Sequence, residues 1–409
     1  MTSIQRSGSS CVRARGVQPV PWRKTYLSWI GQPLWSLGFR PFFLAGAGFG
    51  CIALALWGMW LYGHLPAAQP LGGMLAWHRH EMPFGFATAI IAGFLLTAVP
   101  NWTGRPGISG GPLLGLCLVW LVARLAWWLP VPAPLLLGVQ GAFLPLLAWV
   151  LGRELVAAGK RDNYPIVAVL GLLALCQGLT LWGIAENDLT YQRRGVLAAL
   201  WLLAALLSVI GGRVIPLFIQ RGLNRPAGPA DRPWTTRLLL ITTLLLALSI
   251  GLGLGELPTP WLALPYGLIL VLQVRRLWRW HDLGLWRVPL LWSLYLAYAW
   301  LALAALAMVL WHLGVLPYQS LASHALAVGG LGGLVLAMIA RVSLGHTGRP
   351  LRAPITVVIG FGLMLLAALC RVLLVPFNGW ALGLSAALWC VALGLFVLSY
   401  SGLLLKPRL

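Results

Sequence analysis

Long apolar runs recur along nearly the whole chain, separated by short stretches rich in Pro, Gly and Arg. A helix needs about 20 residues to cross a hydrocarbon core about 30 Å thick, so each long run predicts one membrane-spanning helix. We expect twelve such helices, at residues 41–62, 82–100, 112–130, 134–152, 165–184, 195–217, 238–255, 260–274, 288–311, 321–341, 354–375 and 380–404. The pattern therefore predicts an all-α, polytopic membrane protein.

Composition agrees with this pattern. Of the 409 residues, 60% are hydrophobic and only 9% are charged, and the mean hydropathy is +0.85. Such a chain has too few polar side chains to cover the surface of a water-soluble domain. Soluble enzymes and soluble binding domains are therefore excluded.

The charge distribution predicts the orientation in the membrane. The formal net charge is +21, which by itself suggests a nucleic-acid partner. The basic residues, however, are concentrated in the two tails and the even-numbered connections, whereas the odd-numbered connections hold only Arg79, Arg193 and Arg194. Because cationic loops stay in the cytoplasm, both termini are predicted to be cytoplasmic. We expect a multi-pass protein of the bacterial inner (cytoplasmic) membrane, with membrane lipids and no nucleic acid as partners.

The chain divides into one membrane domain and two tails. Residues 1–33 are polar and basic and contain no apolar core followed by a cleavage site, so we expect a flexible or interfacial tail and no signal peptide. Residues 34–404 form the membrane domain, and residues 405–409 form a short C-terminal tail.

Three spans end in similar motifs at their cytoplasmic ends. These motifs are TAVPNWTGRP at 97–106, RVIPLFIQRG at 213–222 and RVSLGHTGRP at 341–350. Shifts of 116 and 244 residues superpose Arg105, Arg221 and Arg349. Since the three motifs lie four spans apart, we predict three four-helix units, at about 41–152, 165–274 and 288–404.

The 244-residue shift also carries His80 onto His324 and nearly superposes Arg124 on Arg371. Each histidine lies 24 to 25 residues before its inner Gly-Arg pair, which is about 36 Å of helix. Both histidines are therefore predicted near the outer face.

Paired histidines at equivalent positions favour a ligand-binding role. Neutral imidazole is the commonest metal ligand, and two imidazoles from separate helices can take both axial positions of a haem iron. We expect His80 and His324 to be those ligands, and Arg124 and Arg371 to hold the haem carboxylates. The alternatives are interfacial histidines bonded to backbone carbonyls and arginines that snorkel to the membrane surface.

The stretch WHRHEMPFGF at 77–86 carries a second histidine. On a helix, His78 and His80 lie about 200° apart and cannot both face one metal. His78 shares a face with Glu81 and Met82, and an imidazole with a thioether suits copper. We therefore expect His78 to serve a second metal or haem, with further ligands supplied elsewhere in the chain, for which His64 and His312 lie on the correct side.

Acidic residues are few. All eight lie in connections or at span ends, which disfavours an ion-coupled transporter because such proteins generally need an ionisable group near the midplane. Glu81 is the only acid near the outer histidines in the sequence, so it is the candidate residue for proton delivery. Basic residues also gather at the inner, cytoplasmic ends of the spans. This inner cluster is either a surface that binds anions or lipid headgroups, or a set of charges that only anchors the cytoplasmic side. Its members are Arg105, Arg221, His346, Arg349 and Arg352.

These motifs resemble a known family. WHRHEMPFGF with GFLLTAVPNWTGRP, then GGRVIPLFIQRG, then SHALAVGGLGGLVLAMIARVSLGHTGRP are similar to the signatures of the NnrS family, over a region from about Pro33 to the C-terminus. The resemblance implies a twelve-span membrane protein with haem and copper, produced with denitrification and nitric-oxide stress responses. The positions that match the family motifs are His78, His80, Glu81, Arg105, Arg213, Pro216, Arg221, His324, His346 and Arg349.

The architecture also resembles subunit I of the haem-copper oxidases and nitric-oxide reductases. That superfamily has twelve spans in three four-helix units, with haem ligands in spans two and ten, and His80, His324 and Arg371 fall in matching places. It also has three histidines in spans six and seven, where this chain has none. The resemblance therefore implies the haem site but not an oxidase-type binuclear centre.

The sequence thus predicts an inner-membrane protein with a haem, expected to be b-type, and with copper as an option. The leading hypothesis is that it binds or converts nitric oxide or nitrosyl adducts near the periplasmic face, and whether it is an enzyme stays open. The alternatives are a haem-containing electron-transfer or quinol-linked subunit and a small-solute transporter.

Overall fold

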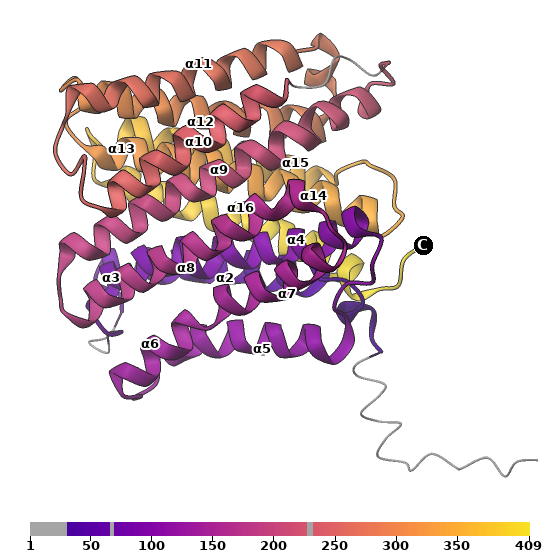
Figure 1. Cartoon of the computed structure of the whole chain (residues 1–409), viewed down its shortest axis with the longest axis horizontal. Coiled ribbons are helices and arrows are strands. Elements are labelled where there is room, and N and C mark those ends of the chain that lie inside the picture. The colour runs from indigo at the N-terminus through magenta and orange to yellow at the C-terminus, as the bar shows by residue number, and fades with distance from the viewer. Residues whose placement is uncertain (1–30, 66–68, 227–231) are drawn as a thin grey trace, which may run out of the picture.

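The computed structural model describes residues 31–65, 69–226 and 232–409. The predicted N-terminal tail lies outside the described residues except for residues 31–33. Every regular element in the described part is a helix (Figure 1).

The helices follow the predicted order. The first third of the chain contains α2 (Phe39–Leu61), α3 (Gly73–His80), η2 (Glu81–Ala87), α4 (Thr88–Thr103), α5 (Gly110–Ala126), α6 (Ala133–Gly141) and α7 (Phe143–Ala157). The middle contains α8 (Tyr164–Ala185), α9 (Leu189–Gly222), α10 (Pro233–Gly251) and α11 (Ala263–Trp280). The last third contains α12 (Pro289–His312), α13 (Gln319–His324), η6 (Ala325–Gly332), α14 (Gly333–His346), α15 (Ile355–Leu369), η7 (Cys370–Leu374) and α16 (Trp380–Leu405). Four short 3₁₀ turns complete the described elements, namely η1 (Pro33–Trp35), η3 (Arg161–Asn163), η4 (Pro260–Leu262) and η5 (Leu283–Arg287).

Within the described residues, ten helical segments are long and apolar enough to cross a membrane, so the chain is a multi-pass membrane protein. The predicted spans 112–130 and 260–274 are also helical, as α5 and α11, but they are not among the ten. The helix α5 is only 17 residues long, and α11 carries Arg275, Arg276 and Arg279 near its end. The count of twelve spans therefore remains a prediction.

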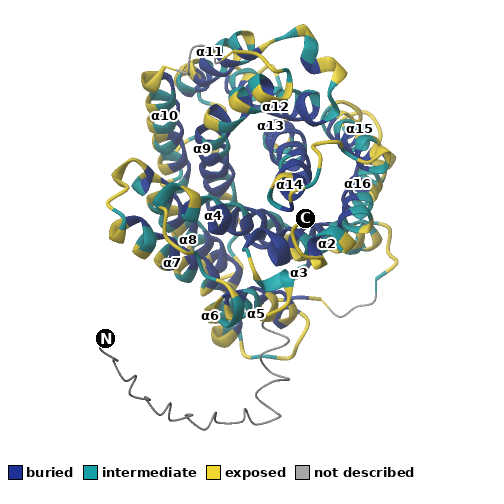
Figure 2. Cartoon of the chain, turned by 90° about the vertical axis from the view of Figure 1, so that its right-hand side faces the viewer, coloured by how far each residue is buried: buried dark blue, intermediate teal, exposed yellow. Residues whose placement is uncertain are grey.

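Two segments form the interior of the bundle. They are α3–η2–α4 and α13–η6–α14, in each of which 83% of the most apolar stretch is buried, against 39% for α2, α15 or α16. Figure 2 shows α13 and α14 inside a ring of helices that includes α9, α12, α15, α16, α2 and α4. The segments that carry the predicted histidines are therefore core helices that other helices shield from lipid.

Each core segment contains a π-helical stretch directly after its histidine. The stretch η2 begins one residue after His80, and η6 begins one residue after His324, 244 positions later. In η2, Pro83 has no N–H to donate to the preceding turn, which favours a break in the regular pattern. Trp120 Nε1 donates a hydrogen bond to the Gly85 carbonyl at 2.9 Å and ties this stretch to α5. π-Helical stretches are rare and often occur at functional sites, so the histidines beside these two stretches are candidate functional residues.

The described chain has both of its ends at one end of the bundle. Arg40, at the start of α2, donates to the carbonyls of Leu404 and Lys406 at 2.7 and 2.6 Å. Leu409 N donates to the carbonyl of Thr347 at 3.0 Å. The helices α3 and α13 begin at the opposite end (Figure 1). The charge pattern also predicts both chain termini at the same end of the bundle. Which side of the membrane that end faces stays a prediction.

Close packing at Gly329 gives a testable consequence of this core. A Cβ added at Gly329 would overlap the ring of Trp300, whereas one added at Gly178 would meet nothing within 4 Å. We expect Gly329→Ala to lower the free energy of unfolding by about 1–3 kcal/mol, as overpacked cores do. Gly178→Ala, the matched control, should be neutral or slightly stabilising. Thermal unfolding in detergent measures both, and equal effects of the two substitutions would contradict the packing.

Candidate functional site

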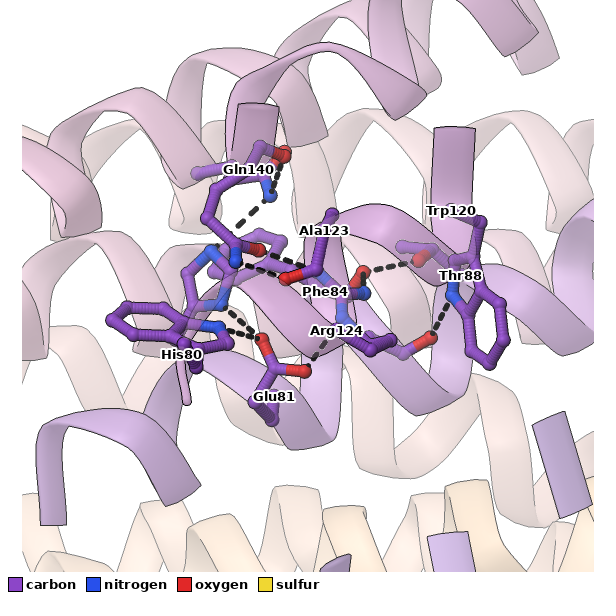
Figure 3. Close-up of polar contacts among 11 residues, drawn as sticks. His80, Glu81, Phe84, Thr88, Trp120, Ala123, Arg124 and Gln140 are labelled. Atoms are coloured by element: carbon purple, nitrogen blue, oxygen red, sulfur yellow. Dashed lines mark hydrogen bonds and ion pairs between the residues drawn. The ribbon is translucent and has the colours of Figure 1, made fainter. Parts of the chain in front are cut away.

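A buried polar network lies where α3 meets η2, with Glu81 at its centre (Figure 3). The Glu81 side chain is fully buried, and Arg124 Nε lies 2.7 Å from its Oε2 atom. Its Oε1 atom accepts hydrogen bonds from Trp127 Nε1 and His80 Nδ1, both at 2.7 Å. Arg124 and Trp127 are three residues apart and therefore share one face of the end of α5. A buried ion pair is tolerated when hydrogen bonds satisfy the remaining atoms, and this network has that form.

The network changes the interpretation of Glu81 and Arg124. The sequence placed Glu81 at a span end, whereas the continuous helical segment Gly73–Thr103 contains it eight residues after its start. Glu81 is therefore a buried acid within a span. Arg124, which we expected to hold a cofactor carboxylate, holds the carboxylate of Glu81 instead.

Two glutamines that the sequence analysis overlooked complete the network. Arg124 Nη2 donates to Gln140 Oε1 at 2.5 Å, and Gln140 Nε2 donates to the carbonyl of Ala123. Gln177 Nε2 donates to the carbonyl of Gln140 at 2.9 Å and lies 3.2 Å from His80 Nε2. Both ring nitrogens of His80 therefore have partners within the protein.

A cavity of about 740 Å³ lies beside this network. Its walls come from α2, α3, η2, α9, α13, η6, η7 and α16 and are largely apolar, with Trp57, Phe86, Leu200 and Trp389 among the lining residues. Its volume falls within the range of about 300–1,000 Å³ that ligand and cofactor sites have. His78 and His324 both line this cavity, as do Met82 and Arg371, whereas His80 and Glu81 do not.

His324 is held by two neighbours. Its Nδ1 atom lies 2.7 Å from the Ser320 carbonyl, so the proton of the neutral ring is assigned to Nδ1. Arg371 Nη2 lies 3.1 Å from Nδ1 and 3.2 Å from Nε2. The carbonyl fixes the ring orientation and leaves the lone pair on Nε2, which Arg371 Nη2 approaches at 3.2 Å.

The environment of His78 differs from that of His324, because its neighbour is an aromatic ring. Its ring stacks on Trp57 with centroids 4.4 Å apart and an interplanar angle of 13°. Its Nδ1 atom is buried and has no hydrogen-bond partner among the described residues. Buried polar atoms without a partner are uncommon and costly, so this nitrogen indicates a group that belongs beside it.

The structure therefore brings together a different pair of histidines from the one that the repeat suggested. His78 and His324 face one cavity, and His80 turns toward α5 and α8, which contribute Trp127 and Gln177. The predicted separation of about 200° between His78 and His80 agrees with the structure, in which the two side chains lie on opposite sides of α3.

The remaining sequence candidates lie away from the cavity. Arg105 pairs with Glu154 at 3.0 Å, Arg213 Nη1 donates to Asn163 Oδ1 at 2.8 Å, and His346 lies against the Phe39 ring at 5.7 Å. These residues, with Arg221 and Arg349, lie toward the opposite end of the bundle from the cavity. None of them lines the cavity that His78 and His324 line.

The other outer histidines also have different surroundings. His312 Nδ1 accepts a hydrogen bond from the backbone N–H of Thr259 at 3.1 Å, and its ring stacks on Tyr266. His64 is exposed at the end of α2. Across the described ranges, no group of three or more His, Cys, Asp or Glu side chains is arranged to hold a metal ion.

Comparison with known families gives a match over nearly the whole chain. The sequence profile described as NnrS protein matches residues 33–408. The chain belongs to the NnrS family. The match begins at η1 and extends beyond α16, so both core segments, the polar network and the cavity lie within the NnrS region. The comparison with curated proteins finds no match to this chain.

Proposed function

We propose that this NnrS protein binds a haem in the cavity between His78 and His324 and acts on nitric oxide or nitrosyl species. The observation that carries the proposal is that two imidazoles from separate core helices line one largely apolar cavity of cofactor size. Membership of the NnrS family is consistent with a role related to nitric oxide.

The donor atoms fit a haem iron. The Ser320 carbonyl accepts from His324 Nδ1, so Nε2 is the atom that would bind a metal. His78 has a buried Nδ1 atom with no partner in the described protein, and its ring is oriented by Trp57. His80 does not line the cavity, and its two ring nitrogens face Glu81 and Gln177 on the other side of α3. We therefore assign the second ligand to His78 in place of His80.

The protein's own residues would define the environment of the site. Trp57, Phe86 and Leu200 supply an apolar wall that excludes water. Met82 adds a soft thioether to the wall that His78 lines, which keeps copper as a second candidate metal. When bound, the haem would supply an iron that binds nitric oxide or carries one electron.

Glu81 has a supporting role in this proposal. It is adjacent to Met82 in the chain, but its carboxylate is engaged by Arg124, Trp127 and His80 and does not line the cavity. We propose that it fixes α3 and η2 against α5, so that the opposite face of α3 presents His78 to the cavity. The site lies at the end of the bundle that the charge pattern assigns to the periplasmic side of the inner membrane.

The absorption spectrum of the purified, reduced protein before and after addition of nitric oxide tests this function. We expect a haem spectrum that changes to that of a nitrosyl adduct, which requires one of the two imidazoles to give way to the gas, together with measurable disappearance of nitric oxide from solution. Protein that contains no haem when purified from haem-sufficient cells, or whose haem spectrum nitric oxide leaves unchanged, would contradict the proposal.

A second candidate function rests on the same pair of imidazoles. Two histidine ligands can occupy both axial positions of an iron and leave no free position for a gas, which is typical of electron-transfer haems. A haem spectrum that is insensitive to nitric oxide, with rapid reduction by a quinol, would favour this membrane electron carrier.

A further inference from the structure

The cavity wall has an excess of positive charge. Its charged lining residues are Arg79, Arg193, Arg371 and Glu256. The one carboxylate among them, on Glu256, accepts from Arg194 Nε, so a residue outside the lining already neutralises it. Three guanidinium groups thus line a largely apolar cavity whose one carboxylate is already paired with Arg194.

Arg79 is the member of this set with an unsatisfied atom. Its Nη1 atom is buried and has no hydrogen-bond partner among the described residues. Arg79 follows His78 directly on α3, so the two unpartnered buried nitrogens come from adjacent residues that line the same cavity. A buried guanidinium nitrogen without an acceptor is costly, and its natural partner is a carboxylate.

Arg193 adds a second cation from a different helix. It belongs to the first turns of α9, and its Nη2 atom lies 3.5 Å from Gln319 Oε1 at the start of α13. Arg193 and Arg79 line the same cavity from α9 and α3, so their like charges repel each other. Two like charges in the wall of an apolar cavity favour an anion between them.

We propose that Arg79 and Arg193 bind the carboxylate groups of the cavity's ligand. The ligand class is a flat apolar molecule with two carboxylates on one edge, as in a haem, so this inference rests on the proposed function. It replaces the expected role of Arg124, whose guanidinium holds Glu81, and leaves Arg371 as the neighbour of His324.

The binding of metal-free porphyrins isolates this recognition from iron ligation. The full-length protein, purified without haem in detergent, is titrated with protoporphyrin IX, which has two carboxylates, and with its dimethyl ester, which has none. We expect the wild-type protein to bind the diacid at least about tenfold more tightly than the ester. Arg79→Gln and Arg193→Gln should each weaken binding of the diacid about tenfold and leave binding of the ester nearly unchanged.

Two controls make the result decisive. Arg287→Gln removes an exposed arginine outside the cavity lining and should keep the full preference for the diacid. Arg79→Lys retains the charge and should retain part of the preference, which separates a binding role from a folding defect.

The outcomes separate the two proposals. Equal affinity of the wild-type protein for diacid and ester, or variants that keep the wild-type preference, would overturn the arginine site while leaving the haem cavity standing. Failure of the wild-type protein to bind either porphyrin would overturn both proposals.

Discussion

The variants His78→Ala and His324→Ala are expected to lose the haem absorption of the wild-type protein, whereas His80→Ala keeps it. The reason is geometric: His78 and His324 line the cavity, and His80 does not. A histidine that ligates a metal supplies a bond that no neighbouring side chain replaces. Haem per protein and the absorption spectrum, measured on membranes with equal amounts of protein, give the comparison.

His64→Ala is the matched control, because His64 is exposed and lies outside the cavity lining. It should retain the wild-type haem content. His80→Ala can lower stability by breaking the contact with Glu81, so its spectrum is judged per folded protein. Loss of haem in His80→Ala with retention in His78→Ala would restore the pair that the repeat suggested and contradict our assignment.

The second large effect is expected at the buried ion pair. Glu81→Leu and Arg124→Leu should each lower the free energy of unfolding by about 3–5 kcal/mol, because each leaves an uncompensated charge in the protein interior. The double variant should recover most of that loss, since apolar side chains of similar volume tolerate burial. A double-mutant cycle from unfolding in denaturing detergent measures this coupling.

The pair Arg153–Glu154 provides the control for this cycle. Its arginine is about half exposed and lies 3.1 Å from the carboxylate, so Arg153→Leu should cost about 0–1 kcal/mol. If the losses in free energy of unfolding from Glu81→Leu and Arg124→Leu simply add in the double variant, the two groups are not coupled as we describe.

Much of the fold follows from the sequence. Each of the twelve predicted spans overlaps a helical segment, because an apolar run of membrane length has no other way to satisfy its backbone in lipid. Ten such segments among the described residues are long and apolar enough to cross a membrane. The separation of His78 from His80 also follows from helical geometry alone. The presence of several histidines and arginines toward one end of the bundle follows from their positions in the odd-numbered connections and outer span ends.

The choice between His78 and His80 needed tertiary information. The repeat aligned His80 with His324, and both residues do precede a π-helical stretch. The residue that follows the histidine differs between the two segments, however. It is Glu81 after His80 and Ala325 after His324. The carboxylate of Glu81 binds both His80 and Arg124, whereas His324 has no such neighbour in sequence and instead contacts Arg371. This difference was visible in the sequence, but its meaning depends on α5 lying beside α3.

The glutamines and the π-helical stretches were harder to foresee. Gln140 and Gln177 carry no charge, and each lies in an apolar run that predicts only a span. Pro83 offers a local signal for η2, but η6 contains no proline and only glycines mark it. Partners 16 to 97 residues apart in the chain determine this network, so the pattern of any one span does not reveal it.

A structure determined on the protein purified with its native cofactor tests the central claim most directly. We expect planar density in the cavity lined by His78 and His324, with His324 Nε2 directed at its centre and Ser320 still accepting from Nδ1. A cavity filled by lipid or side chains, or a haem bound at His80 with the bond to Glu81 broken, would contradict the account.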